Sequence, residues 1–203
     1  MTLIGFDFSI KKPAACILKN NNYNFISWPY ELSKTQQKAY KNSPITIIER
    51  KDTKINVKNV SEKLRYEVRN ANYLATLIIN SLDFNDKEIF LGFEGLSYGS
   101  KGDVILQLSS YKFILMDSLS RLVPLENMFT YAPITIKKTA GCSKRGMGKA
   151  NMIEAFKLMP TKFSRYLKEN ESLFKTKFGN WIGHLDDLVD AFFVLKTLEK
   201  NIE

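Results

Sequence analysis

The stretch LIGFDFS, residues 3–9, decides the fold expected of this chain of 203 residues. Its residues are almost continuously apolar, as in a central strand of an α/β sheet that is covered on both faces. Asp7 interrupts the run. A carboxylate in a buried strand is costly unless a partner or a cation offsets its charge. We therefore expect a central strand that ends in a functional group.

Further elements follow from apolar segments and helical spacing on either side of this strand. Short apolar segments predict strands over residues 3–9, 14–18, 23–28, 88–93 and 128–136. Apolar residues at helical spacing predict helices over residues 61–82, 104–122, 150–158 and 185–199. Ser61 is the expected N-cap of the first helix. Pro133 places the last strand at an edge or in a bulge. This order predicts an α/β fold in which the first and fourth strands are parallel.

Residues 29–60 are rich in Lys and Asn and include one expected strand, at residues 45–49. We interpret this segment as an insertion in a single domain that covers residues 1–203. A hydrophobic content of 44% is sufficient for a core.

Composition indicates a partner and a compartment. The 30 Lys and Arg outnumber the 21 Asp and Glu, and the net charge of +9 favours a polyanion, nucleic acid before a membrane surface. Cys16 and Cys142 form neither a disulfide framework nor a zinc spacing, which indicates a reducing compartment. No signal peptide and no apolar run of membrane-spanning length is present, so a cytoplasmic protein with no membrane partner is expected.

Four acids occupy positions where a structural role is hard to assign. Asp7 and Glu94 stand at the ends of expected parallel strands, where ligands gather in α/β sheets. Asp187 and Asp190 are three residues apart on the packing face of the last helix. The alternative is that each acid caps a loop or is stabilised by the helix dipole in a first helical turn. We assign Asp186 to that alternative, as a solvated first-turn residue. Asp190 lies beyond the first turn, where a dipole role ends.

Clustered buried carboxylates resist ionisation unless cations are bound. Oxygen ligands suit Mg²⁺, for which Mn²⁺ is expected to substitute, and two ions roughly 4 Å apart can activate a water and stabilise a leaving oxygen. The acids therefore predict two-metal hydrolysis of a nucleic-acid phosphodiester.

A basic segment precedes the last helix. Between residues 132 and 150 there is no acid, and the basic residues are Lys137, Lys138, Lys144, Arg145 and Lys149. Phosphate contact fits this segment, although a solvated loop is the alternative. The spacing of GMGK does not match a nucleotide-binding P-loop. His184 is open to two interpretations. In one it orients a water or contacts the scissile phosphate, and in the other it is a partly exposed residue at the start of a helix.

Four motifs in order resemble the RuvC family of Holliday junction resolvases: GFDFS, FEG, the stretch YAPITIKKTAGCSKRGMGKANMIEAF, and DLVDA. The resemblance implies a ribonuclease H-like fold with a central mixed five-stranded sheet, three antiparallel strands then two parallel, flanked by helices. It implies that Asp7, Glu94, Asp187 and Asp190 are the catalytic acids and metal ligands. It also implies functional roles for Lys137 and Lys149.

The resemblance further implies a homodimer that cleaves branched DNA. The departures from the family pattern are similar to those of phage or viral relatives, which act in the cytoplasm of a bacterial host. The family places a base-probing aromatic just after the strand-four Glu, and Tyr98 is the candidate here. Residues 29–60 and 161–177 are longer than the family pattern. Two alternatives stay open. One is another ribonuclease H-like nuclease, such as an exonuclease or a packaging or replication nuclease. The other is a non-catalytic relative that binds nucleic acid.

Overall fold

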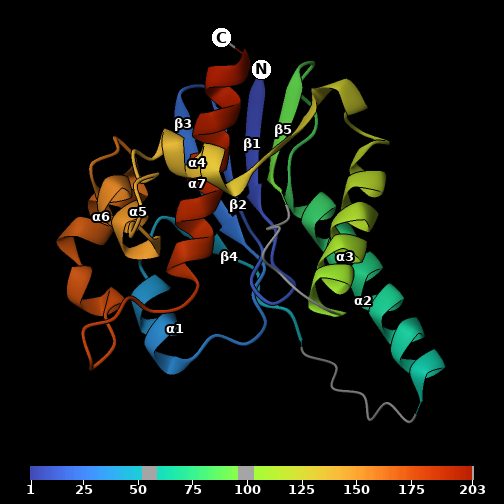
Figure 1. Ribbon diagram of the computed structural model, residues 1–203, viewed down its shortest axis with the longest axis horizontal. Helices are drawn as coiled ribbons and strands as arrows, with labels where there is room; N and C mark the ends of the chain where they lie inside the picture. Colours follow the sequence, from blue (N-terminus) through green and yellow to red (C-terminus); the bar gives the residue numbers. More distant parts are fainter. Residues whose placement is uncertain (52–58, 96–102, 203) are drawn as a thin grey trace.

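The computed structural model describes residues 1–51, 59–95 and 103–202 as a mixed α/β fold, with helices on both faces of one sheet (Figure 1). The strands are β1 (Thr2–Asp7), β2 (Ala14–Lys19), β3 (Asn22–Ser27), β4 (Ile45–Ile47), β5 (Ile89–Glu94) and β6 (Met128–Tyr131). The α-helices are α1 (Lys34–Tyr40), α2 (Val60–Ser81), α3 (Asp103–Leu119), α4 (Pro133–Thr139), α5 (Lys149–Lys157), α6 (Lys162–Glu169) and α7 (Leu185–Ile202).

The sheet has the order β4-β3-β2-β1-β5-β6 within the described residues. β2 pairs antiparallel with both β1 and β3, whereas β5 runs parallel to β1 and β6 runs parallel to β5. This confirms the expected three antiparallel strands followed by two parallel ones. The expected total of five strands is wrong, because β4 adds a sixth, parallel to β3. β4 corresponds to the strand expected at residues 45–49, in the segment interpreted as an insertion, which also contains α1.

Two local predictions also differ from the structure. The strand expected over residues 128–136 ends at Tyr131, and Pro133 begins α4. Proline suits a first helical turn because its missing N–H would have had no partner there. The N-cap of α2 is Asn59 rather than Ser61, and the Asn59 side chain accepts a hydrogen bond from the Glu62 N–H at 2.9 Å.

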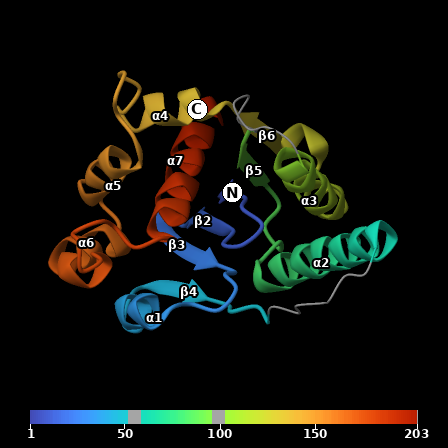
Figure 2. The ribbon, with the colours of Figure 1, turned by 60° about the horizontal axis from the view of Figure 1, so that its bottom comes forward.

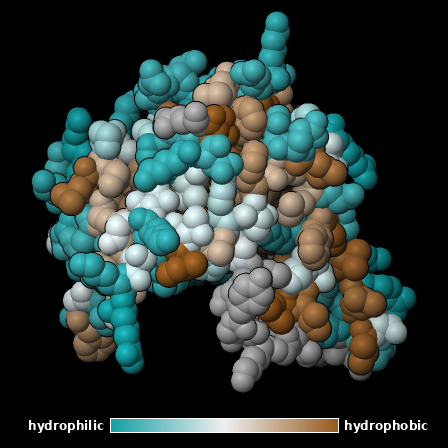
Figure 3. All heavy atoms as spheres, turned by 45° about the horizontal axis from the view of Figure 1, so that its top comes forward, coloured by the Kyte–Doolittle hydropathy of each residue, from teal (hydrophilic) through white to brown (hydrophobic). Residues whose placement is uncertain are grey.

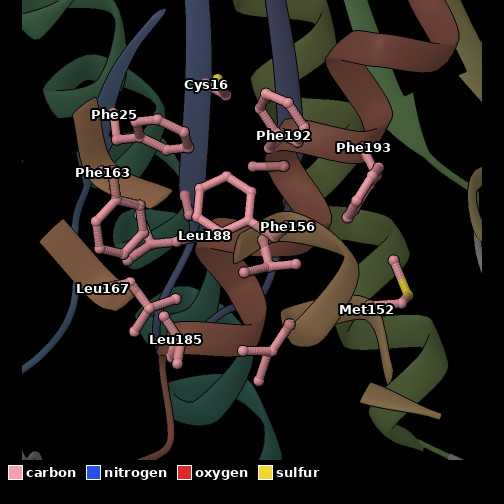
Figure 4. Packing of buried hydrophobic residues seen from close by; sticks show 14 of the residues in the cluster. Cys16, Phe25, Met152, Phe156, Phe163, Leu167, Leu185, Leu188, Phe192 and Phe193 are labelled. Carbon is pink, nitrogen blue, oxygen red and sulfur yellow. The ribbon is translucent and has the colours of Figure 1, made fainter. Parts of the chain in front are cut away.

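Helices cover both faces of the sheet (Figure 2), and each face has its own layer of buried apolar residues. Helix α7, with α5 and α6 beyond it, covers one face, and α2 and α3 cover the other. Residues of β1 alternate between the layers, with Leu3 on the α7 side and Ile4 and Phe6 on the α2 side. The α7 layer is aromatic, as Figure 4 shows, and the ring centroids of Phe156 and Phe192 are 5.1 Å apart.

Gly5 allows α7 to lie directly on β1. A Cβ atom at this position would lie 2.4 Å from the Leu195 nitrogen and 2.5 Å from the Ala191 oxygen. The helix backbone therefore occupies the space that a side chain would fill. This close approach brings the residue before Ala191, Asp190, toward the end of β1.

The apolar stripe of α2 extends beyond the core. Ala71, Ala75 and Ile78 are buried, whereas Leu64 is 64% exposed and Val68 is 46% exposed. Figure 3 shows apolar side chains gathered over this side of the molecule, around α2 and α3. None of the described helices is long and apolar enough to span a bilayer.

Candidate metal centre and nucleic-acid interface

Three acids from three elements meet at one edge of the sheet. Asp7 is the last residue of β1 and Glu94 the last residue of β5. Because β1 and β5 are adjacent and parallel, these two ends lie side by side. Helix α7 crosses them and adds Asp190, so that one carboxylate oxygen from each acid lies within 4.8 Å of the other two. The sequence prediction that these three acids gather therefore agrees with the geometry.

Asp187 lies one turn earlier on α7 and also lines the cleft, whose volume is about 360 Å³. The side chain is buried, and its Oδ2 atom has no hydrogen-bond partner among the described residues. The Lys12 ammonium lies 3.7 Å from this oxygen. A buried carboxylate oxygen with a free lone pair is suited to ligate a cation.

The electrostatics of the cluster oppose four separate negative charges. Burial, followed by repulsion from Glu94, raises the pKa of Asp190 to about 7. Burial, followed by repulsion from Asp186, raises the pKa of Asp187 to about 6. Burial also raises the pKa of Glu94, and burial together with the charges of Asp187 and Asp190 raises the pKa of Asp7 well above its usual range. A hard divalent cation would offset this repulsion, and the ligand atoms are all oxygens, as Mg²⁺ and Mn²⁺ require.

Lys112 is a cleft residue that the sequence predictions missed. It projects from α3, is 7% exposed, and donates a hydrogen bond of 2.6 Å to the Glu94 carbonyl oxygen. Its ammonium lies 5.6 Å from the centroid of the Phe93 ring. Burial lowers the Lys112 pKa to about 8. The available signal was a lone lysine inside the apolar run of α3, which helical spacing alone does not assign to a site.

The predicted basic residues fall into two groups. Lys137, in α4, and Lys149, at the start of α5, line the acidic cleft. Lys138, Lys144 and Arg145 are exposed and do not line it. The segment is also partly helical, because α4 occupies residues predicted to be strand and loop. Tyr98 lies outside the described residues.

Asp186 is not the solvated residue that we expected. Its carboxylate forms an ion pair with Lys149 and accepts a hydrogen bond of 3.2 Å from the His184 N–H. Burial acts to raise the Asp186 pKa, but the contact with Lys149 lowers it overall. Asp186 therefore joins the start of α7 to the start of α5.

His184 differs from both interpretations of the sequence. The residue is fully buried, with its Nε2 atom 2.8 Å from the Ser27 hydroxyl, so it is neither in the cleft nor partly exposed. Burial lowers its pKa to about 4. Its surroundings are those of a neutral, structural imidazole.

The sequence matches no protein-family model and no curated protein sequence. Solved structures that align with the whole chain include RuvC of T. thermophilus in complex with Holliday junction substrate, at 10% identity and a TM-score of 0.48, covering 100% of this chain and 96% of that chain. The yeast mitochondrial Holliday junction resolvase Ydc2 aligns at 14% identity and a TM-score of 0.46, covering 97% of this chain and 76% of that chain. Because the identities are this low, we base the function proposed below on the side chains of the cleft.

Proposed function

We propose that this chain is a divalent-metal-dependent endonuclease of the ribonuclease H-like type that cleaves Holliday junctions or other branched DNA. The observation that carries the proposal is the meeting of Asp7, Glu94 and Asp190 within 4.8 Å, at the ends of two parallel strands. A cluster of three acids has no structural use that would offset its repulsion. It has a clear use as a ligand set for hard cations.

The residues present fit a metal centre. Asp7, Glu94 and Asp190 would hold the cation, and the Oδ2 atom of Asp187, which accepts no hydrogen bond from the described residues, would complete the ligand set. Bound Mg²⁺, or Mn²⁺ in its place, supplies an activated water and stabilises the leaving oxygen of a phosphodiester. No His or Cys takes part, which disfavours zinc.

The lysines of the cleft have a separate role in this proposal. Lys137 and Lys149 line the acidic cleft and offer ammonium groups to a phosphate that approaches it. Lys144 and Arg145 are exposed on the loop between α4 and α5 and would contact the DNA backbone farther from the reacting bond. The acids thus bind the cation and the basic residues hold the strand.

The proposal of branched DNA as the substrate rests on the motif resemblance. A homodimer fits this substrate because a four-way junction offers two symmetric cleavage points. Another ribonuclease H-like nuclease would use the same acids on a linear substrate. A binding protein without activity would not need ionised acids at all.

The proposal is tested by cleavage of a matched set of substrates: a four-way junction, a fork, duplex, single strand and an RNA–DNA hybrid, each with Mg²⁺, with Mn²⁺ and with EDTA. We expect metal-dependent cleavage of the junction. The variants Asp7→Asn and Asp190→Asn should abolish cleavage and retain junction binding, because the basic residues are unchanged. Metal-dependent cleavage that persists in both variants would refute the assignment of the acids.

The basic loop is tested separately by junction binding over a range of salt concentrations. The double variant Lys144→Ala, Arg145→Ala should bind more weakly. The slope of its log affinity against log salt concentration should fall by the amount that corresponds to about two phosphate contacts. The variant Lys63→Ala is the matched control, since Lys63 is a lysine of α2 that does not line the acidic cleft. Identical salt slopes in the double variant and the wild type would remove the loop from the interface.

A further inference from the structure

The residue before α7 has an unusual backbone conformation for its surroundings. Among the described residues, the non-glycine residues with positive φ are Asn20, Asn21 and His184, the last at 85°. The two asparagines are exposed in the turn between β2 and β3, where this conformation is common. His184 is fully buried. A strained backbone at a buried position persists only where the surrounding contacts impose it.

The hydrogen bonds of the His184 ring show what imposes it. The Ser27 hydroxyl donates to the Pro13 carbonyl oxygen at 2.7 Å, which uses the only hydrogen of that hydroxyl. The Ser27 oxygen must therefore accept from His184 Nε2, 2.8 Å away. The imidazole is thus the neutral tautomer with its proton on Nε2. Its Nδ1 atom has no partner among the described residues, as an unprotonated ring nitrogen permits.

This chain of bonds joins the start of α7 to the end of β3 and to the residue before β2. Ser27 ends β3, and the Pro13 carbonyl oxygen, directly before β2, also accepts from the Trp28 N–H at 3.0 Å. On the helix side, the His184 carbonyl oxygen accepts from the Leu188 N–H at 3.4 Å. The anchored residue therefore supplies an acceptor to the first turn of α7. Asp187 and Asp190 follow it by three and six residues on the same helix.

We propose that His184, through Ser27 and Pro13, is a positioning residue that sets where the first two turns of α7 lie relative to Asp7 and Glu94. It acts through the helix backbone and touches neither substrate nor cation. The inference rests on the proposed function, which gives Asp187 and Asp190 their roles. It explains why a buried imidazole lies so near an acidic centre without lining it.

Three variants separate the ring's hydrogen bond from the backbone conformation. His184→Gly accepts the positive φ without strain but loses the bond to Ser27. His184→Gln keeps a terminal N–H donor that can reach Ser27. Ser27→Ala removes the acceptor at the other end, 157 residues away in sequence. Ser118→Ala is the matched control, since the Ser118 hydroxyl also donates to a backbone carbonyl oxygen, that of Ile114 at 2.8 Å, on α3.

We expect His184→Gly and Ser27→Ala to lower kcat by about 10²-fold, the effect of small displacements of reacting groups. Mn²⁺ binding, measured by electron paramagnetic resonance, should weaken in the same two variants, and KM for the junction should stay unchanged. His184→Gln should recover most of kcat and of Mn²⁺ affinity. Ser118→Ala should match the wild type in all three quantities.

Amide hydrogen exchange of the metal-free protein provides a readout that needs no activity. The anchor predicts faster exchange confined to the first turns of α7 in His184→Gly and Ser27→Ala. The inference would be overturned if His184→Gly exchanged its amides and bound Mn²⁺ as the wild type does. It would also be overturned if His184→Gly and His184→Gln lost kcat and Mn²⁺ affinity equally, in proportion to their loss of melting temperature. If the wild type neither binds Mn²⁺ nor cleaves DNA, the proposed function fails, whereas exchange confined to α7 would still support the anchor.

Discussion

Replacing Asp190 with asparagine should stabilise the metal-free protein at about pH 8, although it removes a ligand of the proposed metal centre. Burial and the nearby Glu94 raise the Asp190 pKa from 3.8 to about 7. A carboxyl group whose pKa is higher in the folded than in the unfolded state binds its proton more tightly when folded. The free energy of unfolding therefore falls as the pH rises from about 4 to about 7, and it stays low above that range.

The size of the gain follows from the same shift. If Asp190 titrated alone, a pKa of about 7 would correspond to about 4 kcal/mol of destabilisation above neutral pH. Its titration is shared with Asp7, Glu94 and Asp187, and the asparagine amide must itself be buried. We therefore expect Asp190→Asn to raise the free energy of unfolding by about 1–3 kcal/mol at about pH 8.

Urea unfolding in EDTA, followed by tryptophan fluorescence, measures this difference. The gain should shrink as the pH falls, and it should vanish at about pH 3, where the Asp190 carboxyl group is protonated in both the folded and the unfolded protein. Asp117→Asn is the control, because the Asp117 side chain on α3 is 74% exposed and should show no such gain. With saturating Mg²⁺ the order should reverse, since cation binding stabilises only a protein with an intact ligand set. Equal or lower stability of Asp190→Asn at about pH 8 in EDTA would refute the reasoning.

Three further predictions concern the same edge of the sheet. Gly5→Ala should lower the free energy of unfolding by about 3 kcal/mol in urea titrations, because the added Cβ meets the α7 backbone at 2.4 Å; a stable Gly5→Ala protein would contradict this packing. Burial lowers the Lys112 pKa from 10.5 to about 8, so stability should rise between about pH 8 and pH 10 in the wild type, by about 2 kcal/mol more than in Lys112→Met; parallel pH profiles would show that the ammonium is not buried. Mn²⁺ affinity, measured by calorimetry, should increase from about pH 5.5 to pH 8 as Asp187 and Asp190 release protons, whereas a flat profile would exclude them as ligands.

The candidate site shows which residues can be identified from local pattern. Asp7 and Glu94 interrupt or end apolar strands, and Asp190 lies on the packing face of an apolar helix, so each is conspicuous within its own segment. Lys112 interrupts an apolar helix without a spacing that assigns it to a site, and Lys12 has no local signal. Lys112 lines the cleft because α3 packs beside the acids, and Lys12 comes near Asp187 because the loop after β1 lies beside α7.

The amino-acid sequence by itself determined the alternation of strands and helices, the mixed character of the sheet and the acids at its edge, because these depend on short-range periodicity and on parallel strand ends meeting. Only the tertiary structure decided that the strand expected at residues 45–49 joins the sheet as its sixth strand, that a helix begins at Pro133, that Asp186 pairs with Lys149 and that His184 is buried. β4 has three residues, and its place in the sheet depends on its pairing with β3. His184 is buried, and its ring is hydrogen-bonded to Ser27, which is distant in sequence. Burial and partners are properties of packing, and they distinguish a ligand from a structural residue.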